Sequence, residues 1–157
     1  MRLAVYLAGE IHTDWRGEIA RGLDDAGLDV DLLHPITDHE ASDAAGVEIL
    51  GDQGQRFWND QLGAGLNAVR TRSLVPRSDV VVVRFASRYG EWNGALDAGR
   101  ALALGKPLVT LHPPELDHAL KEVDRAAVAV ARSTEQVVGI LGYAFGDMAT
   151  SAAGAAT

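Results

Sequence analysis

Apolar residues occur along the chain in short, uninterrupted runs. The clearest is the run of four valines at 80–83 in "SDVVVVRFA", which shows no polar alternation and indicates a strand buried on both faces of a parallel sheet. A similar run at 3–8 ends at Gly9 and predicts the first strand. The other predicted strands cover residues 28–34, 106–112 and 126–131.

Between these runs, apolar residues follow a helical period. Trp15, Ile19 and Leu23 recur at every fourth position of residues 14–26, which predicts a helix that Gly27 ends. The other predicted helices cover residues 54–75, 92–105, 114–122 and 133–145.

The alternation of strands and helices predicts an α/β fold with a parallel sheet and helices on both of its faces. We expect one domain over residues 1–146 and a flexible tail of small residues at 147–157. Residues 35–53 are polar and acidic without a clear period, so we expect a long loop there. Ligands of such sheets bind at the topological switch point, which in a flavodoxin-like order lies between the first and third strands.

Composition narrows the class of protein. The chain has 157 residues, 47% of them hydrophobic, and no run near the roughly 18 apolar residues of a membrane span, so we expect a soluble domain. The apolar start is too short for a signal peptide, and the absence of cysteine excludes disulfides and fits a cytoplasmic protein. A net charge of −8 disfavours long nucleic acids as partners, but not a small nucleoside or nucleotide.

Three polar segments, "GEIHTDW", "TDHEASD" and "SRYGEWN", should meet at the binding edge of the sheet. Two tryptophans beside carboxylates suit a flat, hydrogen-bonding ligand such as a base or a sugar. Trp15 has a second interpretation, as the first core residue of its helix. The candidate ligand-binding residues here are Gly9, Glu10, His12, Asp14, Trp15, Asp38, His39, Asp43, Trp92 and Asn93.

The familiar cofactor and hydrolase motifs are absent. The chain has no GxGxxG after the first strand, no GxxxxGK[ST] and no GxSxG, which argues against dinucleotide, triphosphate and serine-hydrolase chemistry. Histidines and acids in the segment 34–43 could bind a divalent ion, but their spacing matches no metal template and acidic loops are usually solvated. We therefore expect no cofactor and no metal.

Asp97 lies in the second turn of the helix predicted at 92–105, on the side of Asn93. Glu91 comes just before that helix. A helix N-terminus stabilises nearby anions, so Asp97 is either a surface acid placed there by the helix dipole or a nucleophile held over a pocket. The pattern of residues alone leaves both interpretations open.

Four segments, "VYLAGEIHTDWR", "DHEASD", "RTRSL" and "WNGALDAGRALALGKPLV", together resemble the YtoQ-like family over about residues 2–145. That family is similar to the nucleoside 2-deoxyribosyltransferase superfamily, whose members cleave N-glycosidic bonds. The resemblance implies a flavodoxin-like three-layer sandwich with a five-stranded parallel sheet. It also implies a nucleoside- or nucleotide-like ligand and a homo-oligomer, a dimer or larger.

The resemblance also implies roles for individual residues. In the superfamily, a Tyr lies on the first strand, and a nucleophilic Glu follows an active-site Asp by six residues. Tyr6 falls at the Tyr position, Asp97 at that of the nucleophile and Glu91 at that of the preceding acid, which makes these three the catalytic candidates. Asp79, which opens the third strand, matches a position that is usually structural.

The chain departs from the superfamily pattern at two positions. Asp97 is shorter than Glu by about 1.5 Å, a difference that catalysis tolerates poorly. Another active-site acid is replaced by Thr71, between Arg70 and Arg72. These arginines either bind an anionic group of the ligand or pair with the excess acids of the protein.

Two functions are compatible with this pattern. The first is an N-glycosidic-bond enzyme, a hydrolase or deoxyribosyltransferase-like transferase, in which Asp97 is the nucleophile, Glu91 the general acid/base and Tyr6 a positioning group. The alternative is a non-catalytic domain on the same scaffold that binds a nucleotide or a sugar phosphate, which would explain the altered acids.

Overall fold

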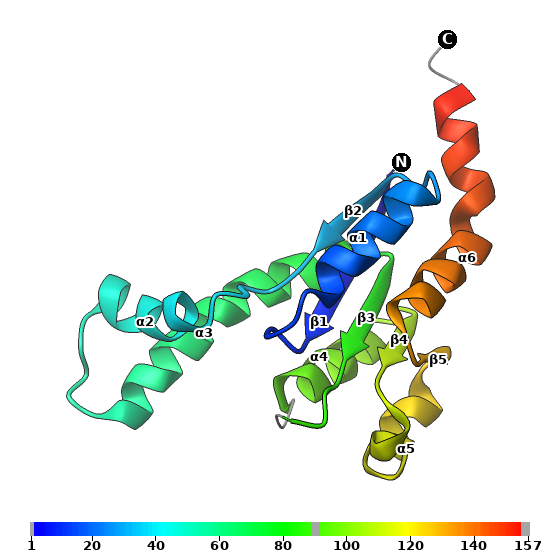
Figure 1. The fold of residues 1–157 in the computed structure, drawn as a ribbon. Helices are drawn as coiled ribbons and strands as arrows, with labels where there is room; N and C mark the ends of the chain where they lie inside the picture. Colours follow the sequence, from blue (N-terminus) through cyan, green and yellow to red (C-terminus); the bar gives the residue numbers. More distant parts are fainter. Residues whose placement is uncertain (1, 89–91, 155–157) are drawn as a thin grey trace.

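The computed structural model describes residues 2–88 and 92–154, with side chains in the second range up to residue 146. Within these residues, five parallel strands form one sheet in the order β2-β1-β3-β4-β5, which confirms the predicted α/β fold (Figure 1). The strands are β1 (Leu3–Gly9), β2 (Val30–Leu33), β3 (Val80–Arg84), β4 (Leu108–Leu111) and β5 (Ala129–Ala131). The α-helices are α1 (Trp15–Asp25), α2 (His39–Leu50), α3 (Arg56–Leu74), α4 (Trp92–Ala103), α5 (Asp117–Ala126) and α6 (Thr134–Gly154).

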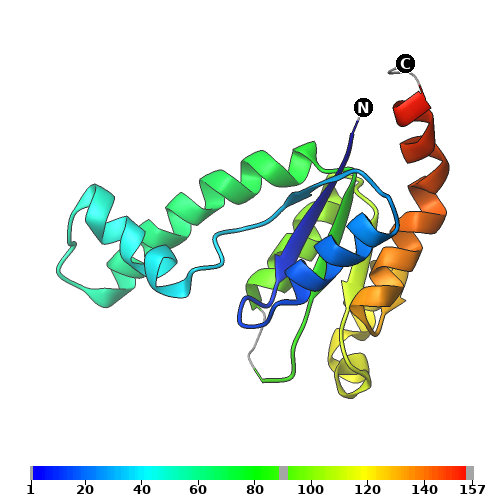
Figure 2. The ribbon, with the colours of Figure 1, turned by 45° about the horizontal axis from the view of Figure 1, so that its top comes forward.

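Helices cover both faces of the sheet, as the alternation of elements predicts (Figures 1 and 2). On one face, α1 and α6 pack against the strands, and the core there includes Trp15, Ile19 and Leu141. On the other face, α4 packs through Ala98 and Ala101, with α5 beside it. The valines of β3 contribute alternately to the two cores, which explains why the whole run is apolar.

Strands β1 and β3 are joined closely at both ends. At the start of β3, the carboxylate of Asp79 accepts a hydrogen bond from the Ala4 N–H at 2.9 Å, so this acid has a structural role. At the carboxyl end, Gly9 is paired with Arg84 and has a φ of 93°. A Cβ on Gly9 would lie 2.0 Å from the Arg84 carbonyl oxygen, so the close approach requires glycine here.

The segment for which the sequence predicts a loop, 35–53, contains helix α2, so that prediction is wrong. The Asp38 side chain caps this helix by accepting a hydrogen bond from the Ala41 N–H at 2.9 Å. Gly46 is buried against α3, where a Cβ would lie 2.4 Å from the Gly63 nitrogen. Helices α2 and α3 thus approach closely where Gly46 faces Gly63, and they project from the sheet as a hairpin (Figure 1).

Helix α6 begins with Thr134 and continues to Gly154. It therefore includes most of the segment 147–157 for which the sequence predicts a flexible tail, and the flexibility of that segment stays a prediction. Over the described part of the chain, no helix is both long and apolar enough to cross a membrane.

Candidate functional site

A small polar cluster lies between α3, α4 and strand β1, on the face of the sheet that α4 covers. Tyr6 of β1 is fully buried, and its hydroxyl lies 3.4 Å from Thr71 Oγ1 on α3. Burial raises the pKa of Tyr6, and the nearby Asp97 carboxylate raises it further. Tyr6 is therefore a neutral hydrogen-bond donor at neutral pH, held beside Asp97 and Thr71.

Asp97 of α4 belongs to the same cluster and is 7% exposed. Burial raises the pKa of Asp97, while the guanidinium of Arg100 opposes this rise through an ion pair at 2.9 Å. Helix α4 lies close to the sheet at Gly94, where a Cβ would lie 3.2 Å from Val83 Cγ1 and 3.4 Å from Gly9 Cα. Of the two interpretations that the sequence left open, Asp97 is a buried acid rather than a surface acid.

Arg100 is a site residue that the sequence analysis missed. It lies three residues after Asp97, a spacing at which side chains of a helix are neighbours, so the periodicity of α4 contains the signal. Its charge favours the ionised form of Asp97, which is the form required of a nucleophile.

The other two residues expected near Asp97 on α4 are Trp92 and Asn93, and both are exposed. Trp92 opens the helix and is 82% exposed, so its indole is available to contact a ligand or another protein. Glu91, predicted to be the general acid/base, lies outside the described residues.

Glu10 is buried at the carboxyl end of β1 and shapes the loop that follows. Burial acts to raise its pKa, but hydrogen bonds from the Thr13 hydroxyl and the His12 backbone N–H, together with the charge of Arg84, hold the pKa of Glu10 below its ordinary range. Glu10 is thus an ionised carboxylate whose oxygens already accept hydrogen bonds within the loop.

Trp15 does not take the stacking role that the sequence analysis considered. Its indole is fully buried in the core between α1 and the sheet, and its Nε1–H donates a hydrogen bond to the Glu10 carbonyl at 2.8 Å. A ring buried in this way has no face exposed to a ligand. Asp14, just before it, is exposed and forms an ion pair with Arg21 at 3.0 Å.

The loop after β1 and the start of α2 converge, as the sequence predicts for these two polar segments. The rings of His12 and His39 lie 6.2 Å apart, and His39 Nε2 is 3.7 Å from the Asp43 carboxylate. Asp38 caps α2 and so has a structural role as well. Across the described residues, no three histidine or acidic side chains come together in a way that could hold a metal ion.

Arg70 and Arg72 flank Thr71 on α3 and diverge from it. Thr71 is buried towards Tyr6, whereas both arginines are exposed. Arg70 donates from Nε to the His34 carbonyl at 2.9 Å, and its charge acts to lower the pKa of Tyr6 against the effect of burial. Arg70 therefore borders the cluster.

The chain is similar in sequence to known proteins. The family model described as "Nucleoside 2-deoxyribosyltransferase YtoQ" matches residues 6–145. A protein of Bacillus subtilis (strain 168) named "Uncharacterized protein YtoQ" is 37% identical over 145 residues, covering 92% of this chain and 98% of that protein.

Two solved structures share the fold at 15% sequence identity. One is a 2-deoxyribosyltransferase from Bacillus psychrosaccharolyticus, with a TM-score of 0.54 over 86% of this chain and 90% of that chain. The other is a conserved protein from Enterococcus faecalis V583, with a TM-score of 0.56 over 88% of this chain and 96% of that chain. At this identity, the likeness concerns the fold alone.

Proposed function

The chain belongs to the family described as nucleoside 2-deoxyribosyltransferase YtoQ, and on that basis we propose that it cleaves the N-glycosidic bond of a nucleoside- or nucleotide-like compound. The observation that carries this proposal is the buried carboxylate of Asp97, which is paired with Arg100 and lies near enough to Tyr6 to raise the pKa of its phenol. A buried carboxylate with a raised pKa, beside a neutral phenol and paired with a guanidinium, has the environment of a functional carboxylate.

In the proposed reaction, a carboxylate oxygen of Asp97 attacks the anomeric carbon of the sugar. The bond from this carbon to the base nitrogen breaks, its electron pair goes to the base, and protonated Glu91 supplies the proton that the departing base needs. The product of this step is a glycosyl ester of Asp97. Water, or a second base, then attacks the same carbon, Glu91 takes the proton of the attacking group, and the Asp97 carboxylate is released.

Arg100 and Tyr6 assist this reaction without bonding to the sugar. Arg100 favours the ionised form of Asp97 against the effect of burial, through the ion pair at 2.9 Å. Tyr6, as a neutral donor, orients the Asp97 carboxylate by a hydrogen bond when the ligand is bound. The proposed contacts to the ligand are Gly9, His12, His39, Asp43, Arg70, Arg72, Trp92 and Asn93.

The test is a mass-spectrometric screen of nucleosides and nucleotides for released base, run on the wild-type chain, Asp97→Asn and Asp25→Asn. Asp25 is an exposed acid at the end of α1 and serves as the matched control. We expect base release by the wild type and by Asp25→Asn and its loss in Asp97→Asn. Full activity in Asp97→Asn would exclude this residue as the nucleophile.

A second function, a non-catalytic domain that binds a nucleotide or a sugar phosphate, is favoured by one observation. The ion pair with Arg100 already satisfies part of the Asp97 carboxylate, as in a structural acid. In that case a ligand should raise the melting temperature of the protein while no product forms on prolonged incubation. Base release that Asp97→Asn abolishes would exclude this alternative.

We also propose that the protein acts in the cytoplasm as a homo-oligomer that assembles through the α2–α3 hairpin. Large apolar side chains are exposed at its far end: Ile49, Leu50, Phe57 and Trp58. Exposed apolar patches of this kind are typical of protein interfaces. Sedimentation of the wild type and of Phe57→Ser should show a larger species that the substitution dissociates, and a monomeric wild type would contradict the proposal.

A further inference from the structure

A cavity of about 360 Å³ opens at the carboxyl ends of β3, β4 and β5, and the function proposed above makes no use of it. Its walls include Glu18 of α1 and Thr134 of α6, so it lies on the α1/α6 side of the sheet, whereas Tyr6 and Asp97 belong to the α4 side. Its volume is within the range of small-molecule sites. The carboxyl edge of a parallel sheet is also where such folds bind ligands.

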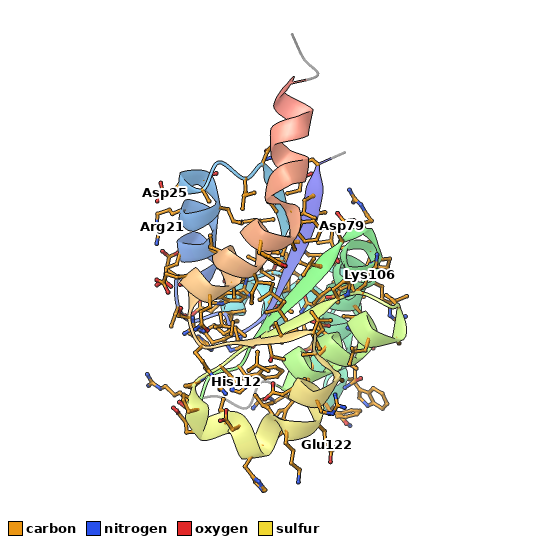
Figure 3. All side chains as sticks on the ribbon, turned by 90° about the vertical axis from the view of Figure 1, so that its right-hand side faces the viewer. Arg21, Asp25, Asp79, Lys106, His112 and Glu122 are labelled. Carbon is orange, nitrogen blue, oxygen red and sulfur yellow. The ribbon has the colours of Figure 1, made fainter. Side chains whose placement is uncertain are left out.

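Arg132 forms one wall of this cavity, and hydrogen bonds on the side away from the cavity hold its guanidinium in place. Its Nη1 donates to Asp117 Oδ1 at 2.6 Å and to the His112 carbonyl at 3.3 Å, and it lies 3.2 Å from His112 Nδ1. His112 is 2% exposed, and its other ring nitrogen is 2.9 Å from the Asp124 carboxylate of α5 (Figure 3 shows His112 close to this helix). The interactions within the described residues engage Nη1 of Arg132 and leave its Nε and Nη2 edge for a ligand.

Arg84 supplies a second guanidinium from the end of β3. Its Nε lies 3.6 Å from the Glu10 carboxylate, which already accepts hydrogen bonds from its own loop. Within the described part of the chain, no hydrogen bond or ion pair engages the two terminal nitrogens of Arg84. Two guanidiniums with available N–H groups, at the ends of β3 and β5 in one cavity, suit an oxyanion with several acceptor oxygens.

The start of α6 completes this part of the cavity through Ser133 and Thr134. The N–H of Gln136 is capped by the Ser133 hydroxyl at 3.3 Å. The first N–H groups of a helix lack partners within the helix, and its N-terminus favours negative charge. The helix therefore adds to the two arginines, whose charges are the main attraction for an anion.

Two carboxylates, Glu18 and Glu135, line the same cavity and decide what else the ligand must carry. Glu18 accepts a hydrogen bond from the Thr134 hydroxyl at 3.0 Å, so its carboxylate is placed to accept hydrogen bonds from hydroxyl groups. Carboxylates repel a second phosphate but accept hydrogen bonds from sugar hydroxyls. The cavity thus combines donors for one anionic group with acceptors for hydroxyl groups.

We propose that this cavity binds a phosphorylated sugar, with the phosphate held by Arg84 and Arg132 and the sugar hydroxyls donating to Glu18 and Glu135. The site is separate from Asp97 and does not require that the chain cleave N-glycosidic bonds. Because the two arginines bind the phosphate, a sugar phosphate should bind more tightly than a free sugar. Because the two carboxylates bind the sugar hydroxyls, a sugar phosphate should also bind more tightly than inorganic phosphate.

The test is calorimetric titration of the whole chain with ribose 5-phosphate, ribose and inorganic phosphate. We expect ribose 5-phosphate to bind more tightly than either of the others. Arg84→Gln should weaken its binding at least about tenfold, a change equivalent to 1.4 kcal/mol. Arg125→Gln, at an exposed arginine of α5 outside the cavity, should bind as the wild type does.

Arg132 also joins the end of β5 to α5, so Arg132→Gln can lose affinity through a change in structure. Arg84→Gln therefore carries the test, and because Arg84 also lies beside the buried Glu10 carboxylate, its affinity is measured at a temperature well below the melting transition of both proteins. Asp97→Asn should leave the affinity unchanged, which keeps this result distinct from the outcome of the base-release screen. The proposal is overturned if ribose 5-phosphate does not bind, if it binds no better than inorganic phosphate, or if Arg84→Gln binds it normally.

Discussion

Asp97 Oδ1 lies 2.9 Å from Nη1 of Arg100, three residues further along α4, and this ion pair is set within a largely buried cluster. The pair has two opposite effects on the carboxylate. Burial disfavours its charge and raises its pKa, and the guanidinium favours the charge without cancelling that rise. The pKa of Asp97 therefore depends on Arg100.

Arg100→Met should move the pH dependence of activity upwards. Methionine retains an apolar stem but removes the charge that opposes the effect of burial, so the pKa of Asp97 should rise further. Base release should then require a higher pH than in the wild type. If the pKa of Asp97 in the variant lies about one unit above neutral pH, the rate of base release at neutral pH should fall about tenfold. The measurement is the pH–rate profile of both proteins, and an unshifted acidic limb would show that Arg100 does not control this carboxylate.

The stability of Asp97→Asn should differ from that of the wild type in a pH-dependent way. The pKa of Asp97 is raised in the folded state, so its favourable contribution is present at low pH and is lost as the pH rises through the folded value. Asparagine cannot ionise, so the variant avoids this loss, which amounts to about 1.4 kcal/mol for each unit of pKa difference. Denaturant unfolding near pH 4 and at neutral pH should show that the unfolding free energy of the variant rises relative to that of the wild type as the pH rises.

Glu10→Gln should show the opposite pH dependence. The pKa of Glu10 is lowered in the folded state, so its stabilising contribution is present above its ordinary pKa and is lost as the pH falls through the folded value. The variant should be less stable by about 1–3 kcal/mol at neutral pH, because hydrogen bonds to a buried charge are lost. The difference should become smaller in acid, and Glu122→Gln, at an exposed position of α5, is the control (Figure 3).

Tyr6→Phe should affect activity more than stability. The hydroxyl contacts Thr71 at a long 3.4 Å, so its removal should cost no more than about 1 kcal/mol of unfolding free energy. If Tyr6 positions Asp97, the rate of base release should fall by about 10- to 100-fold, since small displacements of a reacting group are costly. If Tyr6→Phe has wild-type kinetics, Tyr6 does not position Asp97 and its role is only that of a core residue.

The parts of the fold that depend on large apolar side chains could be predicted from the sequence. The valines at 80–83 and the stripe of Trp15, Ile19 and Leu23 identify a central strand and a helix because burial requires apolar residues at fixed spacings. Helix α2 was missed because its contact with α3 is made by Gly46, whose burial leaves no apolar period. Where two helix backbones touch through glycine, the hydropathy pattern of the sequence gives little sign of the contact.

The candidate site was only partly predictable for a related reason. Asp97 and Tyr6 are far apart in the sequence, and the adjacency of α4 and β1 that joins them follows from topology rather than from a motif. Resemblance to a family supplied that adjacency. The buried position of Glu10 was not predictable, because an ionised side chain is normally exposed and its burial depends on hydrogen bonds that only the folded loop provides.

Gly46→Ala should destabilise the α2–α3 hairpin, because the added methyl group would lie 2.4 Å from the Gly63 nitrogen and would force the two helices apart. Alanine is the better helix former by about 1 kcal/mol, but overpacking against backbone costs about 1–3 kcal/mol and should exceed that gain. Gly139→Ala in α6 is the matched control, since its methyl group would meet open space and should stabilise the protein. Denaturant unfolding of both variants measures the two effects, and hydrogen exchange should show faster opening of α2 in Gly46→Ala. Equal stabilisation by the two substitutions would mean that α2 and α3 are not in close contact.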